Sequence, residues 1–176
     1  MAYCLSSHAI RDLVAAFIVS KLDYCNIVYV GLPAVQLNRL QLAFNGAARV
    51  IYGERKSCHI TPLLESLHWL RIAERVNYKL CLMVFKALQG QAPTCLSELC
   101  TLDVTQRRPL RSAAHSQNML VVSNRANKSN FSDRAFSVAG PASWNGLPVT
   151  LRRSDTKTEF ARGLKSLLFE RSFQCP

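Results

Sequence analysis

The sequence lacks any long apolar run and any motif of established enzyme chemistry. No unbroken hydrophobic stretch approaches the roughly 20 residues that span a bilayer, and the chain does not open with a basic stretch, an apolar run and a small-residue cleavage site. Paired aspartates, a phosphate loop, a dinucleotide fingerprint, a nucleophile elbow and a His-Glu-x-x-His motif are all missing. We therefore expect an intracellular, non-secreted protein without a membrane helix and without an independent active site.

The seven cysteines lack the spacing of zinc ligands. Structural zinc sites usually take two ligands from one tight turn, and no C-x-x-C pair occurs. The nearest approaches are Cys95 with Cys100, and Cys58-His59 with His68 further along. Free thiols in a reducing compartment explain an odd number of cysteines better than zinc or disulfides do. No metal and no cofactor are expected.

Positive charge is the strongest compositional feature. The 176 residues contain 22 Lys and Arg against 11 Asp and Glu, a formal net charge of +11. Residues 1–106 carry a net +3 and residues 107–176 a net +8. A charge of this size attracts polyanions, either nucleic acid or an anionic membrane surface, without sequence preference. The alternative is a basic surface that is only solvated.

Apolar residues at three- and four-residue steps predict a mainly α-helical first part. Gly53 and Gly90 are expected to end helices, and Thr61 and Pro62 to form the N-cap and first position of a short one. Helices are expected at about residues 7–30, 33–52, 61–67 and 72–88, with a helical turn at 93–100. The short connections favour antiparallel neighbours in a bundle.

The part beyond Leu102 is less regular. Only residues 119–122 resemble a strand, and residues 123–132 are polar enough for a loop. A capping box, Thr156-x-x-Glu159, predicts a terminal helix, whose apolar stripe is Phe160, Leu164, Leu167 and Leu168. The predicted fold is thus mainly α, with a helical bundle at residues 1–102 and a smaller, irregular α+β segment at 103–176 that ends in an amphipathic helix.

Two groups of residues could be given a chemical role. His59 and His68 are candidates for acid–base catalysis, although a histidine near a proline or a tryptophan is more often a capping or packing residue. Trp144, Phe131 and Phe136 could form a base-stacking platform, but they are more readily the small core of the second segment. We expect no catalytic, cofactor-binding or metal-binding residue.

Basic side chains off the apolar stripes and in the polar segments are the candidate phosphate contacts. They are Arg39, Arg49, Arg75, Lys79, Arg107, Arg108, Arg111, Arg125, Lys128, Arg134, Arg152 and Arg153.

Short sequence words also occur in a characteristic order. Together they resemble the stretch that follows the catalytic core in LINE-type (non-LTR) retrotransposon reverse transcriptases, in particular those of the jockey superfamily. The words include Lys21-Leu22-Asp23-Tyr24-Cys25-Asn26, Gly31-Leu32-Pro33, Asn45-Gly46-Ala47-Ala48-Arg49, His59-Ile60-Thr61-Pro62, Leu67-His68-Trp69-Leu70, Ala92-Pro93, Arg134-Ala135-Phe136-Ser137 and Trp144-Asn145. The resemblance extends over about residues 15–170 and departs at Arg71, where the family usually has proline.

The resemblance implies an origin and a fold. Residues 9–90 would correspond to the thumb, a helical bundle that grips the template–primer duplex. The catalytic palm with its Asp-Asp motif and the endonuclease lie upstream in such enzymes and are not in this sequence, so no catalytic residue maps onto the chain. The implied protein is a truncated fragment of an RNA-directed DNA polymerase.

Three functional readings remain open from the sequence. The chain could bind RNA or an RNA–DNA hybrid non-specifically and without catalysis. It could instead be a protein-interaction fragment whose apolar faces dock on the missing palm. It could also be the product of a pseudogene without function.

Overall fold

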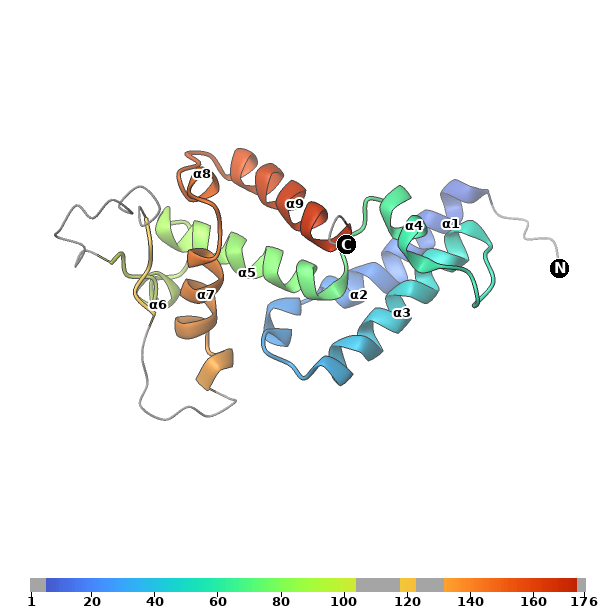
Figure 1. Ribbon diagram of the computed structural model, residues 1–176, viewed down its shortest axis with the longest axis horizontal. Helices are drawn as coiled ribbons and strands as arrows, with labels where there is room; N and C mark the ends of the chain where they lie inside the picture. The colour runs from blue at the N-terminus through green and yellow to red at the C-terminus, as the bar shows by residue number, and fades with distance from the viewer. Residues whose placement is uncertain (1–5, 104–117, 123–131, 174–176) are drawn as a thin grey trace. The chain divides into compact units, whose positions relative to one another are not determined.

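The computed structural model describes residues 6–103, 118–122 and 132–173. These residues are mainly α-helical, which confirms the predicted fold class (Figure 1). The chain forms two compact units. Unit 1 consists of Met1–Val76 with Phe169–Pro176, and unit 2 of Asn77–Leu168.

Unit 1 begins with a continuous helical segment. It consists of α1 (Ser7–Val14), a π-helical turn (Ala15–Val19) and α2 (Ser20–Asp23). Tyr24 is extended and Cys25 is left-handed, with φ of 49°, so the segment stops there, and a 3-10 turn follows at Asn26–Tyr29. The predicted helix over residues 7–30 is therefore correct as far as Asp23 and wrong beyond it.

Helix α3 (Ala34–Tyr52) follows the prediction closely. Pro33 precedes its first turn, and Gly53 ends it in the left-handed conformation, with φ of 66°. A residue with a Cβ atom is strained at that position. Its apolar face is turned inward, because Phe44, Ala47 and Ala48 are buried.

Helix α4 (Ile60–Ser66) starts earlier than predicted. His59, not Thr61, occupies the N-cap position. Pro62 is consequently the third helical residue, where its missing N–H is harmless because first-turn amides have no intrahelical partner.

The main core of unit 1 forms around Phe44 of α3. Trp69 stacks on Phe44 with ring centroids 4.7 Å apart. Leu64 of α4 and Ile72 at the start of α5 (Ile72–Leu88) are buried in the same cluster, and Phe173 packs against it. A second small cluster joins α1 to α3 through Val14, Ala47 and Ile51. Phe173 thus completes a core whose other residues come from the first half of the chain.

Unit 2 is built on α5. Phe85 of α5 stacks on Phe160 of α9 (Lys157–Phe173), with centroids 4.6 Å apart, and Trp144 lies tilted against Phe160 at 5.5 Å. The remaining elements are α6 (Thr94–Ser97), a 3-10 turn (Ser132–Arg134), α7 (Phe136–Asn145) and α8 (Val149–Arg152). Trp144 is only 1% exposed, which makes it a core residue and not a stacking platform.

Close approach of α7 to α5 depends on Gly140. A Cβ atom at this position would lie 3.1 Å from Cγ2 of Val84 and 3.4 Å from the Phe136 ring. The Phe136 ring lies in α7 itself, whereas the Val84 contact lies between the helices and is tighter than ordinary van der Waals contact, so a side chain at residue 140 would require Val84 and α7 to shift by a few tenths of an ångström.

The predicted domain boundary differs from the observed division. The sequence placed it between residues 102 and 103, whereas the two units divide within α5 and again within α9. The reason is the Phe85–Phe160 contact, which joins α9 to α5 although they are far apart in the chain.

The predicted strand at residues 119–122 is wrong in extent. In the described part of the chain, Leu120 forms one isolated antiparallel bridge with Leu102. Val121 N–H donates to Thr101 O and Asp103 N–H to Met119 O, each at 2.9 Å. The predicted loop falls almost wholly on residues outside the described ranges.

Trp144 and Asn145 hold the short segment 118–122 in place. The Asn145 amide accepts from Leu120 N–H at 2.9 Å and donates to Leu120 O at 2.8 Å. Trp144 Nε1 donates to Asn118 O at 2.8 Å. One side-chain amide thus satisfies both backbone groups of a buried residue, as a neighbouring strand would.

Replacing Asn145 with leucine should destabilise the protein. Two buried backbone groups of Leu120 lose their partners, and each such loss costs about 1–3 kcal/mol. We expect the free energy of unfolding in urea to fall by about 2–4 kcal/mol. The control is Asn38→Leu at an exposed position of α3, with an expected change within about 0.5 kcal/mol. Equal effects of the two substitutions would contradict this role of Asn145.

Candidate nucleic-acid interface

The exposed Lys and Arg side chains are the candidates for contacts with phosphates. Eleven are exposed within residues 6–103, 118–122 and 132–173: Arg11, Lys21, Arg39, Arg55, Lys56, Lys79, Arg153, Lys157, Arg162, Lys165 and Arg171. Unit 2 is the more basic unit, with thirteen Lys and Arg against five Asp and Glu over its whole sequence.

The three predicted contacts in unit 1 have different surroundings. Arg39 is exposed on α3. Arg49 is half-buried, and its Nη2 donates to Cys58 O at 3.0 Å. Arg75 has only 18% of its side chain exposed. Of the three, only Arg39 is presented freely to solvent.

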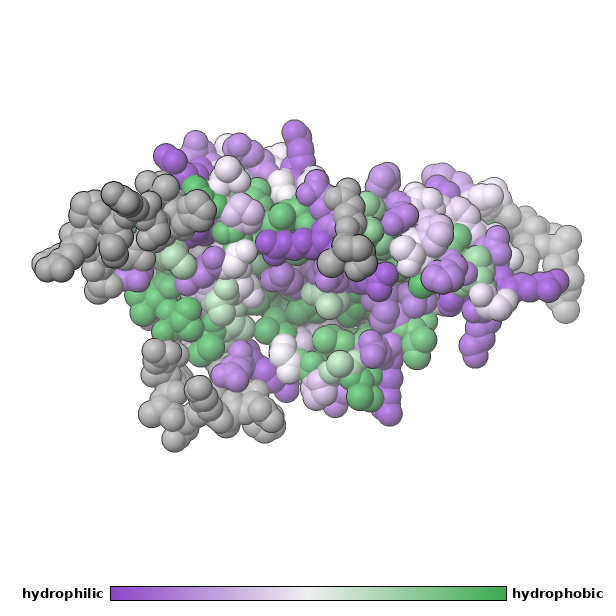
Figure 2. All heavy atoms as spheres, viewed as in Figure 1, coloured by the Kyte–Doolittle hydropathy of each residue, from purple (hydrophilic) through white to green (hydrophobic). Residues whose placement is uncertain are grey.

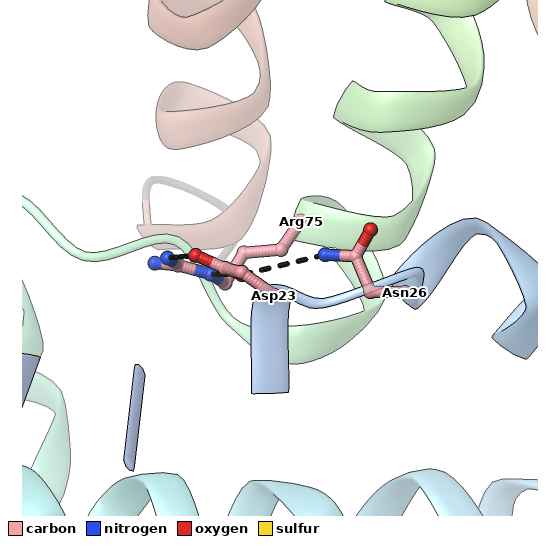
Figure 3. A network of polar contacts seen from close by, with 3 residues as sticks. All are labelled: Asp23, Asn26 and Arg75. Atoms are coloured by element: carbon pink, nitrogen blue, oxygen red, sulfur yellow. Dashed lines mark hydrogen bonds and ion pairs between the residues drawn. The ribbon is translucent and has the colours of Figure 1, made fainter. Parts of the chain in front are cut away.

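Arg75 is held by a polar network (Figure 3). Its Nε donates to Asp23 Oδ1 at 2.8 Å, and its Nη2 pairs with Asp23 Oδ2. Asn26 Nδ2 donates to the same Oδ1 at 3.3 Å. The guanidinium also lies over the Phe44 ring, 5.0 Å from its centroid. Asp23 thus engages both Nε and Nη2 of Arg75, so the structure gives Arg75 a stabilising role.

The predicted contacts in unit 2 also divide by exposure. Lys79 on α5 and Arg153 after α8 are exposed, and Arg134 is half-buried. Arg152 is only 6% exposed, its Nε donates to Leu147 O at 3.2 Å, and burial lowers the pKa of its guanidinium. Among the predicted contacts of unit 2 that the structure describes, Lys79 and Arg153 are therefore the two open to a ligand. The other predicted contacts lie outside the described residues: Arg107, Arg108, Arg111, Arg125 and Lys128.

The predicted contacts did not include three cations of α9 that belong to unit 2. Lys157, Arg162 and Lys165 are exposed, and Arg162 and Lys165 lie off the stripe of α9 that packs in the core. Hydrophilic side chains line the upper edge of Figure 2, where α8 and α9 lie. The signal was present in the sequence, because an apolar stripe at helical period leaves its intervening residues for the outer face.

Arg153 and these three residues form what we call the α8–α9 cation row. No carboxylate of the described residues lies within ion-pair distance of any of the four, since the ion pairs found there are His8–Asp12 and Arg75–Asp23. Asp155 and Glu159 are exposed in the same stretch and reduce its net charge from +4 to +2. The row is thus moderately positive, and its cations are not neutralised by direct pairing.

The two histidines occupy structural positions. His59 is the N-cap residue of α4. His68 has a φ of 51° and lies tilted against the Phe169 ring, with centroids 5.8 Å apart. Neither forms an ion pair or a hydrogen bond through its imidazole within the described ranges, so no acid–base pair is assembled around them.

Metal and thiol chemistry find little support in the geometry. The described residues contain no group of three or more His, Cys, Asp or Glu side chains that could hold a metal ion. Cys81 and Cys100 are buried, whereas Cys25 and Cys95 are exposed. Burial raises the pKa of the Cys100 thiol, which keeps it protonated and unreactive at neutral pH.

Among the residues that the structure describes, none of the helices combines the length and the apolar character needed to cross a bilayer. Comparison with protein-family models, with curated proteins and with solved structures finds no match to the chain.

The Arg75 network predicts that loss of Asp23 lowers the stability of the protein, whereas loss of the exposed Arg39 charge does not. Asp23→Asn removes the charged partner of a largely buried guanidinium, and hydrogen bonds to charged groups are worth about 1.5–3 kcal/mol. We expect a loss of about 2 kcal/mol in the free energy of unfolding, measured in urea, whereas Arg39→Gln should change it by less than about 0.5 kcal/mol. A stability loss from Arg39→Gln as large as that from Asp23→Asn would rule out this distinction.

Proposed function

We propose that the chain binds nucleic acid without sequence preference, through the α8–α9 cation row of unit 2, and that it is a non-catalytic piece of a reverse transcriptase of the LINE type. The binding proposal rests mainly on one observation. Four exposed cations, Arg153, Lys157, Arg162 and Lys165, follow one another on a short stretch of chain without carboxylate partners in the described residues.

The geometry favours contacts to phosphates over contacts to base edges. Arg162 and Lys165 are three residues apart on α9, so they project as neighbours from one side of a helix. Cations on a helix face neutralise backbone phosphates and release counterions, a contribution that is independent of sequence. RNA, single strands and RNA–DNA hybrids all present such phosphates.

The proposed origin rests on the ordered sequence words, and the fold supplies a physical role for several of them. Asp23 and Asn26 belong to the network around Arg75. Trp144 and Asn145 hold segment 118–122. Residues with such roles resist change because each substitution leaves a partner unsatisfied. Several of the sequence words therefore contain residues that stabilise the fold of this chain, as expected if the chain derives from a folded domain of such an enzyme.

A second candidate function comes from the exposed apolar side chains of unit 1. Phe17 is 70% exposed and Tyr24 75%, and Val35 and Leu42 of α3 are exposed to a similar degree. Side chains of this size usually face a partner when they lie together on a surface. Sedimentation that depends on protein concentration, together with no binding of nucleic acid, would favour this protein-docking function over the first.

A salt series tests nucleic-acid binding directly. If four cations touch phosphates, the logarithm of affinity for a duplex should fall against the logarithm of salt concentration with a slope of about −3.5. We expect the double substitution Arg162→Gln/Lys165→Gln to reduce the size of that slope by about 2, as measured by fluorescence anisotropy.

The matched control removes the same charge from unit 1. Arg55→Gln/Lys56→Gln replaces two exposed cations in the turn before α4. If the phosphates of the nucleic acid are contacted elsewhere on the protein, this variant should leave the slope within about 0.5 of the wild-type value. Equal slopes for the two double variants would remove the α8–α9 cation row from the interface.

A further inference from the structure

Unit 2 contains a partly open pocket of about 210 Å³. Its apolar lining residues are Leu88 and Leu102, together with Phe85 and Trp144, whose rings are almost wholly buried. Its polar lining residues include Gln89, Arg152, Arg153 and Asp155. The pocket therefore offers apolar and hydrogen-bonding atoms to the same ligand.

The dimensions and lining exclude several kinds of occupant. A volume of 210 Å³ is below the roughly 300–1,000 Å³ of pockets for drug-sized ligands, so it suits one small ring system. Asp155 is the one carboxylate in the lining, which is too few for a divalent cation that prefers six or more oxygen ligands. The polar rim makes the site unsuitable for an aliphatic chain.

The position of the pocket connects it to the α8–α9 cation row. Arg153 belongs to both, and Asp155 lies between Arg153 and Lys157 in the sequence. A strand whose phosphate contacts Arg153 would have the adjoining base next to the pocket.

We propose that this pocket receives one unpaired nucleobase of a nucleic-acid strand bound along the α8–α9 cation row. The assignment rests on the proposed function. A nucleobase has apolar faces and a polar edge, which matches the mixed apolar and polar lining of the pocket. Arg153 is placed to contact the adjoining phosphate, and the Gln89 amide can both donate to and accept from the base edge.

Asp155 gives the pocket a preference among bases. Its ionised carboxylate only accepts hydrogen bonds, so it pairs with the exocyclic amino groups of adenine, cytosine and guanine. Uracil has no exocyclic amino group, and its one edge donor, N3–H, lies between two carbonyl oxygens that repel a carboxylate. The pocket therefore prefers amino-bearing bases at one position of an otherwise non-specific strand.

The test compares a short fluorescent single-stranded RNA with an abasic sugar–phosphate strand of the same length. We expect wild-type protein to bind the intact strand about tenfold more tightly, since the loss of one base from the pocket weakens binding by roughly that factor or more. Gln89→Phe places an aromatic ring in the pocket from an exposed position and should abolish the difference. Gln91→Phe makes the same change at an exposed residue outside the lining and should preserve it.

A second variant keeps the proposal testable if Gln89→Phe perturbs the fold, which far-ultraviolet circular dichroism would reveal. Asp155→Asn retains the side-chain shape but adds a donor, so oligouridylate and oligocytidylate should become equal ligands where wild-type protein prefers the latter. An unchanged preference in this variant would overturn the role of Asp155.

The remaining outcomes separate the pocket from the proposed function. Equal binding of intact and abasic strands, with a steep salt dependence, would overturn the pocket assignment and leave nucleic-acid binding standing. No binding of either strand would mean that the proposed function itself fails. Free cytidine monophosphate serves as a competitor. If it displaces the base-dependent part of binding as effectively as an intact strand does, the pocket is a mononucleotide site, and the placement of a strand there is overturned.

Discussion

Stacking of Phe85 on Phe160 is the contact on which the rest of unit 2 depends. It joins α5 to α9 across a long stretch of sequence, and Trp144 adds a third ring against Phe160. Aromatic side chains bury about 150–250 Å² each and dominate the energetics of small cores. Once α9 is fixed on α5, its intervening residues face outward, and the pocket forms beside the ends of α5 and α8. The candidate interface is thus a consequence of how a small aromatic core is packed.

Some basic residues of the chain are held in packing contacts, and others are exposed to solvent. Arg75 and Arg152 are counted in the net charge of the chain, yet one is held by Asp23 and Phe44 and the other is buried. Lys79, Arg153 and the cations of α9 are among those that solvent and ligands reach. The net charge of +11 is therefore larger than the charge accessible to a polyanion. The distribution of exposed cations over the surface decides where a polyanion would bind.

Sequence reasoning succeeded where the structure depends on local interactions. Helices α3 and α5 follow from apolar periodicity, and Gly53 ends α3 because only the left-handed region turns the chain there. It failed where contacts between distant residues decide. The break after Asp23 accompanies an ion pair with a residue 52 positions away, and the expected strand is one bridge because Asn145 takes the place of a neighbouring strand for Leu120. Nothing local in the sequence distinguishes the buried Arg152 from the exposed Arg153.

The central claim is that nucleic acid lies along α8 and α9, and amine-reactive footprinting tests it most directly. Lys21, Lys56, Lys157 and Lys165 are all exposed, so each should react at a similar rate in the free protein. Saturating single-stranded RNA at low salt should slow the acylation of Lys157 and Lys165 several-fold, as quantified by mass spectrometry, and leave Lys21 and Lys56 unchanged. Protection confined to Lys21 and Lys56, or equal protection of all four lysines, would contradict the claim.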